Sequence, residues 1–313
     1  MDKRVFVVLA LLIGFVLGAR AQWDVQFSDY TALKSFYNPA VAGTDGKLNV
    51  AGVFSLQTMG YDKSATTLYV GADAPVYFLN PHHGAGLSFF NDNNGIFTST
   101  RISLQYAYNI RVGKRGRLAI GFLGAMMTEK VESKGMTLEE NNDPAFPSSS
   151  ANGNKIDMGA GFYYYHPKLW AGLSAQHLAA PTLVLGDKYE VEVPRMYYLM
   201  GGCNIRLGHS LLTLQPSFLL QSDFDHWRED VQCKLLYESG AKKFFGGVGY
   251  SPEKSVTFLL GGMFHGVNFG YNYQMYTSGI GVINGSHEIV IGYQTDLDLF
   301  KKGRNKHQSV RWL

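Results

Sequence analysis

The segment from Arg101 to Arg111 alternates without interruption between small or polar residues and large apolar ones. Successive side chains of a β-strand point to opposite faces, so this pattern predicts a strand with one face in an apolar medium. The apolar parity consists of Ile102, Leu104, Tyr106, Tyr108 and Ile110. Similar segments of roughly 10 residues, the length that a tilted strand needs to cross a bilayer, recur along the whole chain. The sequence therefore predicts an all-β fold, a transmembrane antiparallel β-barrel of about 14 strands over residues 47–296.

The N-terminus has the features of a secretory signal peptide. Lys3 and Arg4 precede an apolar run from Val5 to Gly18, and residues 19–21 read Ala-Arg-Ala, a cleavage site of the A-x-A type. The alternative is an uncleaved membrane anchor, which needs a longer apolar run. We expect residues 1–21 to be removed after Ala21 during export and the mature chain to reside in the bacterial outer membrane.

Composition agrees with a barrel and argues against nucleic acid as a partner. The 313 residues include 36 Gly, 19 Tyr and 20 Phe, as expected for tight turns and aromatic girdles. The whole chain has 28 basic and 25 acidic residues, and loss of the signal peptide removes three basic residues and one acidic residue, which leaves 25 and 24. A chain so close to neutrality lacks the basic footprint of a nucleic-acid-binding protein.

The two cysteines, Cys203 and Cys233, fall on the apolar parity of their strands, with one strand expected between them. Two strand spacings amount to roughly 9–10 Å, whereas a disulfide needs Cα atoms within about 7 Å. We therefore expect two small lipid-facing side chains without a disulfide. A metal site needs more ligands than this pair offers.

Loop lengths predict the orientation of the barrel. Bacterial barrels have short periplasmic turns and longer outer loops. If the chain starts in the periplasm, tight turns such as 112–116 lie on the periplasmic side. The long connections 131–154, 179–194 and 277–287 then lie on the extracellular side. The short connection at Ser251-Pro252 is an exception to this trend.

Seven charged residues fall on the inward parity and are predicted to face the lumen. Charges are tolerated there because the lumen is wet or filled by polar plug groups. We expect one of them to lie near the seam where the last strand closes against the first. Two interpretations stay open, an ion-pair lattice that stiffens the wall and a role in transport or ligand binding. The seven are Arg101, Arg111, Arg117, Asp157, Arg206, Lys234 and, at the seam, Glu288.

Motifs of catalysis and of cofactor or metal binding are not recognisable in the sequence. Ser174 lies in Gly-Leu-Ser-Ala-Gln, which lacks the second Gly of a nucleophile elbow. The turn Gly113-Lys-Arg-Gly116 is no P-loop. His82-His83 has no carboxylate at ligand spacing, so we expect a solvated turn. The acidic run 138–143 does not have EF-hand spacing and is expected to be a solvated loop. The sequence predicts no enzyme, no catalytic residues, no cofactor and no metal.

The segment before the first predicted strand, residues 22–46, does not alternate. It contains Gln-Phe-Ser-Asp-Tyr at 26–30 and then Asn38-Pro39-Ala40-Val-Ala-Gly43. Pro39 fixes φ and Gly43 permits a sharp turn. We expect an ordered lead-in, which either lines the periplasmic mouth or folds into the lumen as a plug.

The lead-in and the last predicted strand carry a family resemblance. Near its C-terminal end the chain reads Gly285-Ser286-His287-Glu288. A lead of the form Q-F-S-x-Y, followed by N-P-A-x-A-G and closed by G-S-H-E, resembles the PorP/SprF family. These are outer-membrane proteins of the type IX secretion and gliding machinery of Bacteroidetes. The family's lead often reads Q-D-P-x-F-S, whereas the corresponding segment of this chain, Trp23 to Phe27, has no Pro. The resemblance therefore leaves the conformation of this segment open.

The resemblance implies a non-enzymatic component of type IX secretion. The partners that it implies, besides outer-membrane lipid, are the lipoprotein and periplasmic protein of the secretion ring and a peptidoglycan-binding linker protein. Some relatives pair instead with a secreted adhesin, and a substrate's C-terminal domain is a further candidate. The alternative function is an outer-membrane channel or transporter for small or hydrophobic solutes. The sequence does not distinguish service to the general machine from service to one substrate.

The C-terminal tail, residues 297–313, is basic and ends in an aromatic residue. Together with Lys114 and Arg115 of a predicted periplasmic turn, it predicts a basic rim with an aromatic anchor, which suits an acidic protein partner. The alternative is a solvated tail without a partner. The tail residues expected to dock are Lys301, Lys302, Arg304, Arg311 and Trp312.

Overall fold

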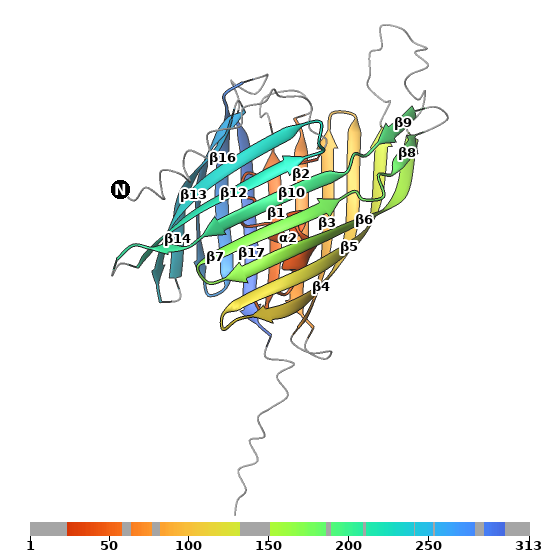
Figure 1. Cartoon of the computed structure of the whole chain (residues 1–313). Helices are drawn as coiled ribbons and strands as arrows, with labels where there is room; N and C mark the ends of the chain where they lie inside the picture. Colours follow the sequence, from red (N-terminus) through yellow and green to blue (C-terminus); the bar gives the residue numbers. More distant parts are fainter. Residues whose placement is uncertain are drawn as a thin grey trace, which may run out of the picture.

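The fold is a closed antiparallel β-barrel (Figure 1). The computed structural model describes residues 24–57, 64–76, 82–131, 151–185, 189–208, 211–240, 242–252, 254–278 and 285–297. Consecutive strands pair with each other around the wall, and β1 (Lys47–Leu56) pairs with β17 (Ser286–Asp296) to close it. β10 (Met196–Cys203) and β11 (Ile205–Arg206) both pair with β12 and form one wall position, so the wall has 14 strands. The predicted fold class and strand number are confirmed.

The remaining wall strands run from rim to rim in sequence order. They are β2 (Thr66–Pro75), β3 (His83–Asn94), β4 (Phe97–Val112), β5 (Gly116–Val131), β6 (Ala151–His166), β7 (Leu169–Gln176), β12 (Leu212–Ser222), β13 (Trp227–Ser239), β14 (Lys242–Ser251), β15 (Ser255–Phe264) and β16 (Val267–Tyr276).

Side-chain exposure alternates along the wall strands, as the sequence predicts. In β4 the outward Leu104 is 65% exposed, whereas the inward Ser103 is 2% exposed. The same alternation places Phe122 of β5 and Leu260 of β15 on the outer surface. An apolar outer surface on a closed barrel is the surface that contacts lipid. Within the described residues no helix is long and apolar enough to cross a membrane.

Both ends of the barrel lie at one rim, because Lys47 at the start of β1 pairs with Asp296 at the end of β17. We call this the terminal rim and the opposite one the loop rim. At the terminal rim the β4–β5, β6–β7, β13–β14 and β15–β16 connections are tight turns. The long β5–β6 and β7–β10 connections lie at the loop rim, as predicted, but the β3–β4 and β14–β15 connections there are also tight.

A small second sheet lies in the β7–β10 connection. It consists of β8 (Thr182–Leu185) and β9 (Tyr189–Glu192), which pair antiparallel near the loop rim (Figure 1). The sequence predicts only a long loop here. Strands of four residues carry too few alternations for the period of two to stand out from an irregular segment.

The lead-in lies inside the barrel. It contains the short helices α2 (Lys34–Tyr37) and η1 (Pro39–Val41), drawn in orange and red within the wall in Figure 1. The core of the molecule is formed between this segment and the wall, and its lead-in members are all less than 4% exposed: Phe27, Tyr30, Leu33, Phe36, Tyr37 and Ala40. They pack against Tyr69 of β2, Phe90 of β3 and Tyr198 of β10. The predicted domain boundaries, including a separate tail from residue 297, stay a prediction.

Cys203 and Cys233 are free and half-buried, on strands that are separated by β12. His82 and His83 differ from the expected solvated turn. His83 is the first residue of β3, and its Nδ1 lies 2.6 Å from the Tyr106 hydroxyl, while His82 Nδ1 lies 2.8 Å from the Asn109 carbonyl oxygen. Both rings also lie against aromatic side chains of β4, His83 against Tyr106 and Tyr108 and His82 against Tyr108.

Candidate functional site

The candidate site is the contact between the lead-in and the lumenal face of the wall. Polar side chains that point into the lumen from widely separated strands bind the backbone and side chains of residues 24–46. These contacts form four groups, which follow one another from the loop rim toward the terminal rim.

The first group lies where the described lead-in begins. His177, just after β7, places Nδ1 2.8 Å from Asp157 Oδ2 and Nε2 3.8 Å from Asp24 Oδ2. The Tyr198 hydroxyl donates to the Asp24 carboxylate. Arg101 Nη1 donates to Gln176 Oε1 at 3.3 Å and lies 3.5 Å from His177 Nε2. Lumenal positions were predicted for Arg101 and Asp157, whereas Asp24 and His177 were not predicted as part of a site.

The electrostatics of this group favour charged forms on both sides. Burial raises the pKa of Asp24, but the nearby His177 ring and the Arg101 charge outweigh it and lower that pKa to about 2. Burial lowers the pKa of His177, but its hydrogen bond with Asp157 and the nearby Asp24 carboxylate outweigh that effect and raise it. The group therefore holds the start of the lead-in by a buried, charge-assisted network.

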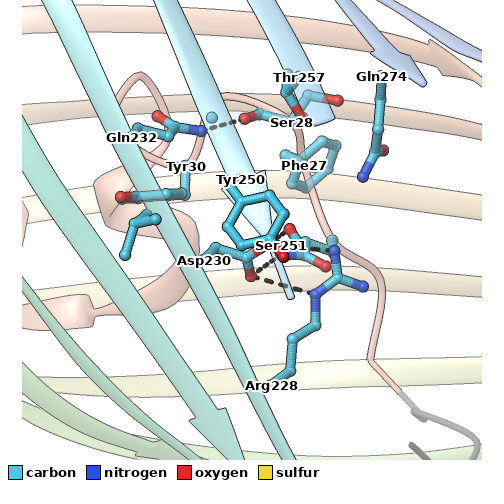
Figure 2. A pocket seen from close by; sticks show the side chains of 13 residues that line it. Phe27, Ser28, Tyr30, Arg228, Asp230, Gln232, Tyr250, Ser251, Thr257 and Gln274 are labelled. Carbon is cyan, nitrogen blue, oxygen red and sulfur yellow. Dashed lines mark hydrogen bonds and ion pairs between the residues drawn. The ribbon is translucent and has the colours of Figure 1, made fainter. Parts of the chain in front are cut away.

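The second group surrounds Asp230 of β13 (Figure 2). The Gln26 side-chain amide and the Ser251 hydroxyl donate to its carboxylate, and Arg228 Nε donates at 3.2 Å. The neighbouring Gln232 donates from Nε2 to the Ser28 carbonyl oxygen. The cavity among these residues has a volume of about 10 Å³, enough for one water molecule at most.

The third group joins the two family motifs. Glu288 of the G-S-H-E motif is 1% exposed and accepts hydrogen bonds from the backbone N–H groups of Ser28 at 2.9 Å and Asp29 at 3.2 Å, both in the Q-F-S-x-Y lead. Asn272 Nδ2 donates to the same carboxylate at 2.7 Å. Lys234 Nζ pairs with Asp29 Oδ2 at 2.5 Å. Residues 260 positions apart in the chain thus meet because one motif is in the lumen and the other on the inward face of β17.

The other residues of the closing motif support β17. Ser286 Oγ lies 2.6 Å from the Tyr276 hydroxyl, and His287 Nδ1 lies 2.7 Å from the Tyr271 hydroxyl. A Cβ at Gly285 would lie 2.5 Å from the Gln274 carbonyl oxygen. Gly285 is therefore required by the close approach of β16.

The fourth group holds the N-P-A-x-A-G motif. Asn38 is fully buried, and its Nδ2 donates to the Phe162 carbonyl oxygen at 2.9 Å, while its Oδ1 accepts from Ala40 N at 2.9 Å. Pro39 is the first residue of η1, where a missing N–H has no cost. A Cβ at Gly121 of β5 would lie 2.3 Å from Ala40 N. The missing side chain of Gly121 therefore leaves room for this turn against the wall, and we call this position the glycine notch.

The chain leaves the lumen at Gly43. This residue has φ of +66°, which favours glycine, and its N–H donates to Asp73 Oδ2 at 2.8 Å. Arg117 Nη1 donates to the Thr44 carbonyl oxygen at 2.8 Å. β1 then begins at Lys47 at the terminal rim.

The predicted charge lattice along the wall is not what these residues form. Arg101, Asp157, Lys234 and Glu288 are each 8% exposed or less, and their hydrogen bonds and ion pairs run largely to the lead-in and His177. Arg117 also reaches the lead-in. Arg111 and Arg206 share the inward parity of their paired residues Arg117 and Thr213, but they lie at strand ends on the terminal rim and are exposed.

Among the predicted docking residues, Lys114 and Arg115 lie in the exposed β4–β5 turn at the terminal rim. Lys301, Lys302, Arg304, Arg311 and Trp312 lie outside the described residues, as do the predicted signal peptide and the region 132–150. Groups of three or more His, Cys, Asp or Glu side chains arranged to hold a metal do not occur in the part of the chain that the structure describes. Ser174 uses its hydroxyl to donate to the Tyr37 carbonyl oxygen at 2.7 Å.

These features define an outer-membrane β-barrel whose lumen holds an N-terminal segment. The family model described as type IX secretion system membrane protein PorP/SprF matches residues 19–293. The chain belongs to this family. It is thus a membrane component of a secretion system, and its family is not one of enzymes.

Solved structures of similar shape are also outer-membrane barrels. The chain is similar to a FadL homologue of Pseudomonas aeruginosa, with a TM-score of 0.48 and 12% identity over 84% of this chain and 93% of that one. It is similar to the monoaromatic hydrocarbon channel CymD (TM-score 0.47, 12% identity, 84% and 91% covered). The toluene transporter TodX of Pseudomonas putida gives a TM-score of 0.47 at 8% identity, with 87% and 95% covered. A search of curated proteins finds no match.

Proposed function

We propose that this protein docks secretion partners at its terminal rim, with the lead-in held permanently in the lumen. The single observation that carries the proposal is the anchoring of residues 24–46 to β4, β6, β7, β13 and β17, which lie on all sides of the lumen. A solute would have to displace Tyr30 and Tyr37, both fully buried, to pass. Membership of a secretion family supports the same reading.

The terminal rim is the docking face in this proposal, and it faces the periplasm. Four exposed basic residues support an electrostatic encounter with an acidic partner: Arg111, Lys114, Arg115 and Arg206. The basic tail, 297–313, continues from the same rim. The partners proposed are the ring lipoprotein and periplasmic protein, the peptidoglycan-binding linker, and a secreted adhesin or a substrate's C-terminal domain.

Charge reversal at the rim tests the proposal. The double variant Lys114→Glu/Arg115→Glu is compared with Lys155→Glu, an exposed basic residue of β6 near the loop rim. Ring components are co-purified with each folded barrel from solubilised outer membrane. We expect the double variant to recover fewer ring components and the loss to deepen at high salt, because exposed charges are screened. The control should behave as wild type.

Deletion of residues 301–313 tests the tail separately. The truncated barrel should fold and lose partner association and secretion. Normal co-purification by both the truncated chain and the rim variant would contradict docking at this rim. Uptake assays in liposomes address the alternative, since a solute channel would admit its substrate without any secretion partner.

A further inference from the structure

A cavity of about 270 Å³ lies beside the lead-in and is distinct from the four groups of anchoring contacts, although it shares Lys234 and Asp29 with one of them. It lies in the half of the lumen nearer the terminal rim, between the lead-in and the wall from β10 to β16, with β6 and β7 at one side. Its lining mixes aromatic and cationic side chains, chiefly Lys34, Lys234, Tyr165, Trp170 and Phe245. The cavity therefore offers both apolar ring surfaces and positive charge to a ligand.

The central group of the cavity is the Lys34 ammonium. Its Nζ lies 3.9 Å from the centre of the Trp170 ring, which is cation–π distance. Among the described residues no carboxylate lies within 4.0 Å of it, whereas Lys234 is already paired with Asp29 at 2.5 Å. Two ammonium groups and one carboxylate leave the cavity with one positive charge in excess.

The charge and the burial of Lys34 suit an anion-binding site. Burial, and after it the charge of Lys234, lower the pKa of Lys34 to about 8, so the group is still largely protonated at neutral pH. Lys34 is half-buried, and no described carboxylate lies within 4.0 Å of its ammonium, so partial desolvation of the charge is costly and an entering anion would relieve that cost. One excess charge matches a monoanion better than a phosphate dianion.

We propose that this cavity binds a carboxylate that carries an apolar or aromatic group, with Lys34 as its counter-ion and Trp170, Tyr165 and Phe245 as its apolar walls. The carboxylate can belong to a small organic acid or to the C-terminus of a peptide, which present the same chemistry. This site does not depend on docking at the terminal rim, because its residues lie inside the barrel.

The test is calorimetric titration of the full-length folded protein in lipid nanodiscs. The probes are 3-phenylpropionate and the peptide Gly-Leu-Phe with a free C-terminus, each compared with its neutral amide. The expected result is that at least one carboxylate binds, about tenfold or more tightly than its amide, because a charge-assisted hydrogen bond is lost in the amide. The tighter carboxylate of the two identifies the source.

The matched variants are Lys34→Met and Lys242→Met. Lys242 Nζ also lies over an aromatic ring, 5.5 Å from the centre of Phe264, but outside the cavity. Lys34→Met should weaken carboxylate binding by about tenfold or more and leave the weak amide binding unchanged, whereas Lys242→Met should bind like wild type. Absence of binding by either carboxylate at millimolar concentration, equal binding of acids and amides, or unchanged binding by folded Lys34→Met would each overturn the proposal. If Lys34→Met does not fold, the comparison of acid with amide on the wild type decides alone.

Discussion

At the scale of single residues, the buried pair Lys234–Asp29 gives a direct measure of how firmly the lead-in is held. Lys234→Met leaves the Asp29 carboxylate, which is almost fully buried, without its cation. Removal of one partner of a buried pair costs about 3–5 kcal/mol. The measurement is the free energy of unfolding of the refolded barrel in urea.

The control for this prediction is Lys243→Met. Lys243 pairs with Glu238 at the same 2.5 Å, but the two side chains are 42% and 38% exposed. Exposed pairs contribute about 0–1 kcal/mol. Similar losses in the two variants would show that Lys234 is not a buried anchor.

His177 predicts the pH dependence of the loop-rim contacts. The groups that face it are Asp157, Asp24 and Arg101, and the two carboxylates raise its pKa above the ordinary value despite burial. A raised pKa in the folded state adds stability that is complete below the ordinary pKa of about 6.5 and is lost as the pH rises through the raised value. Urea unfolding should therefore show a loss of stability with rising pH that His177→Gln removes. An identical pH profile in the variant would rule out this role.

At the scale of elements, the glycine notch in β5 predicts a position-specific effect. Gly121→Ala places a Cβ against the backbone of Ala40 and should displace the N-P-A turn, at a cost of about 1–3 kcal/mol. Gly124→Ala on the same strand meets nothing within 4 Å and should be nearly neutral. Limited proteolysis of the lead-in in the folded barrel measures the displacement. Equal protection in both variants would contradict the notch.

Strand parity is tested by placing an arginine on either face of β4. Leu104→Arg puts a charge on the lipid face near mid-strand and should cost about 2–4 kcal/mol. Ser99→Arg points to the lumen, where Ser99 is only half-buried, and should fold more readily. The shift of the folded band on unheated gels reports the outcome. Equal folding of the two variants would refute the parity.

How far the sequence predicts the structure differs between wall and lumen. The wall strands were predictable because a period of two is a local property, visible within ten residues of β4. The seat of the lead-in was not, because it depends on contacts such as Ser28 with Glu288, 260 positions away. Alternation alone predicts that the inward residues Ser103 and Ala119 accept a charge. In the structure these two side chains are only 2% and 0% exposed, because the lead-in and its neighbours cover them. Inward polar residues of the wall, such as Asp230, were the available signal for the contacts that anchor the lead-in. This signal was weak, because the position of the lead-in was not assigned.

At the scale of the whole molecule, the rim assignment predicts topology in the cell. The connection between β5 and β6 lies at the loop rim, and both chain ends of the barrel lie at the terminal rim. An epitope inserted between residues 141 and 150, a stretch outside the described residues, should be reached by antibody on intact cells. A tag after Leu313 should be hidden until the outer membrane is opened. Surface labelling of the C-terminal tag on intact cells would show that the barrel has the opposite orientation and that the terminal rim faces the cell exterior.

The central claim is that the lead-in occupies the lumen of the folded barrel, and single-channel conductance in planar bilayers tests it most directly. The wild-type protein should be nearly silent, because Tyr30 and Tyr37 are fully buried between the lead-in and the wall and the lead-in backbone is anchored to the wall. A variant that lacks residues 24–43, verified as folded by its heat-modifiable band, should conduct steadily. A large, steady conductance of the wild-type protein, equal to that of the deletion variant, would contradict the account.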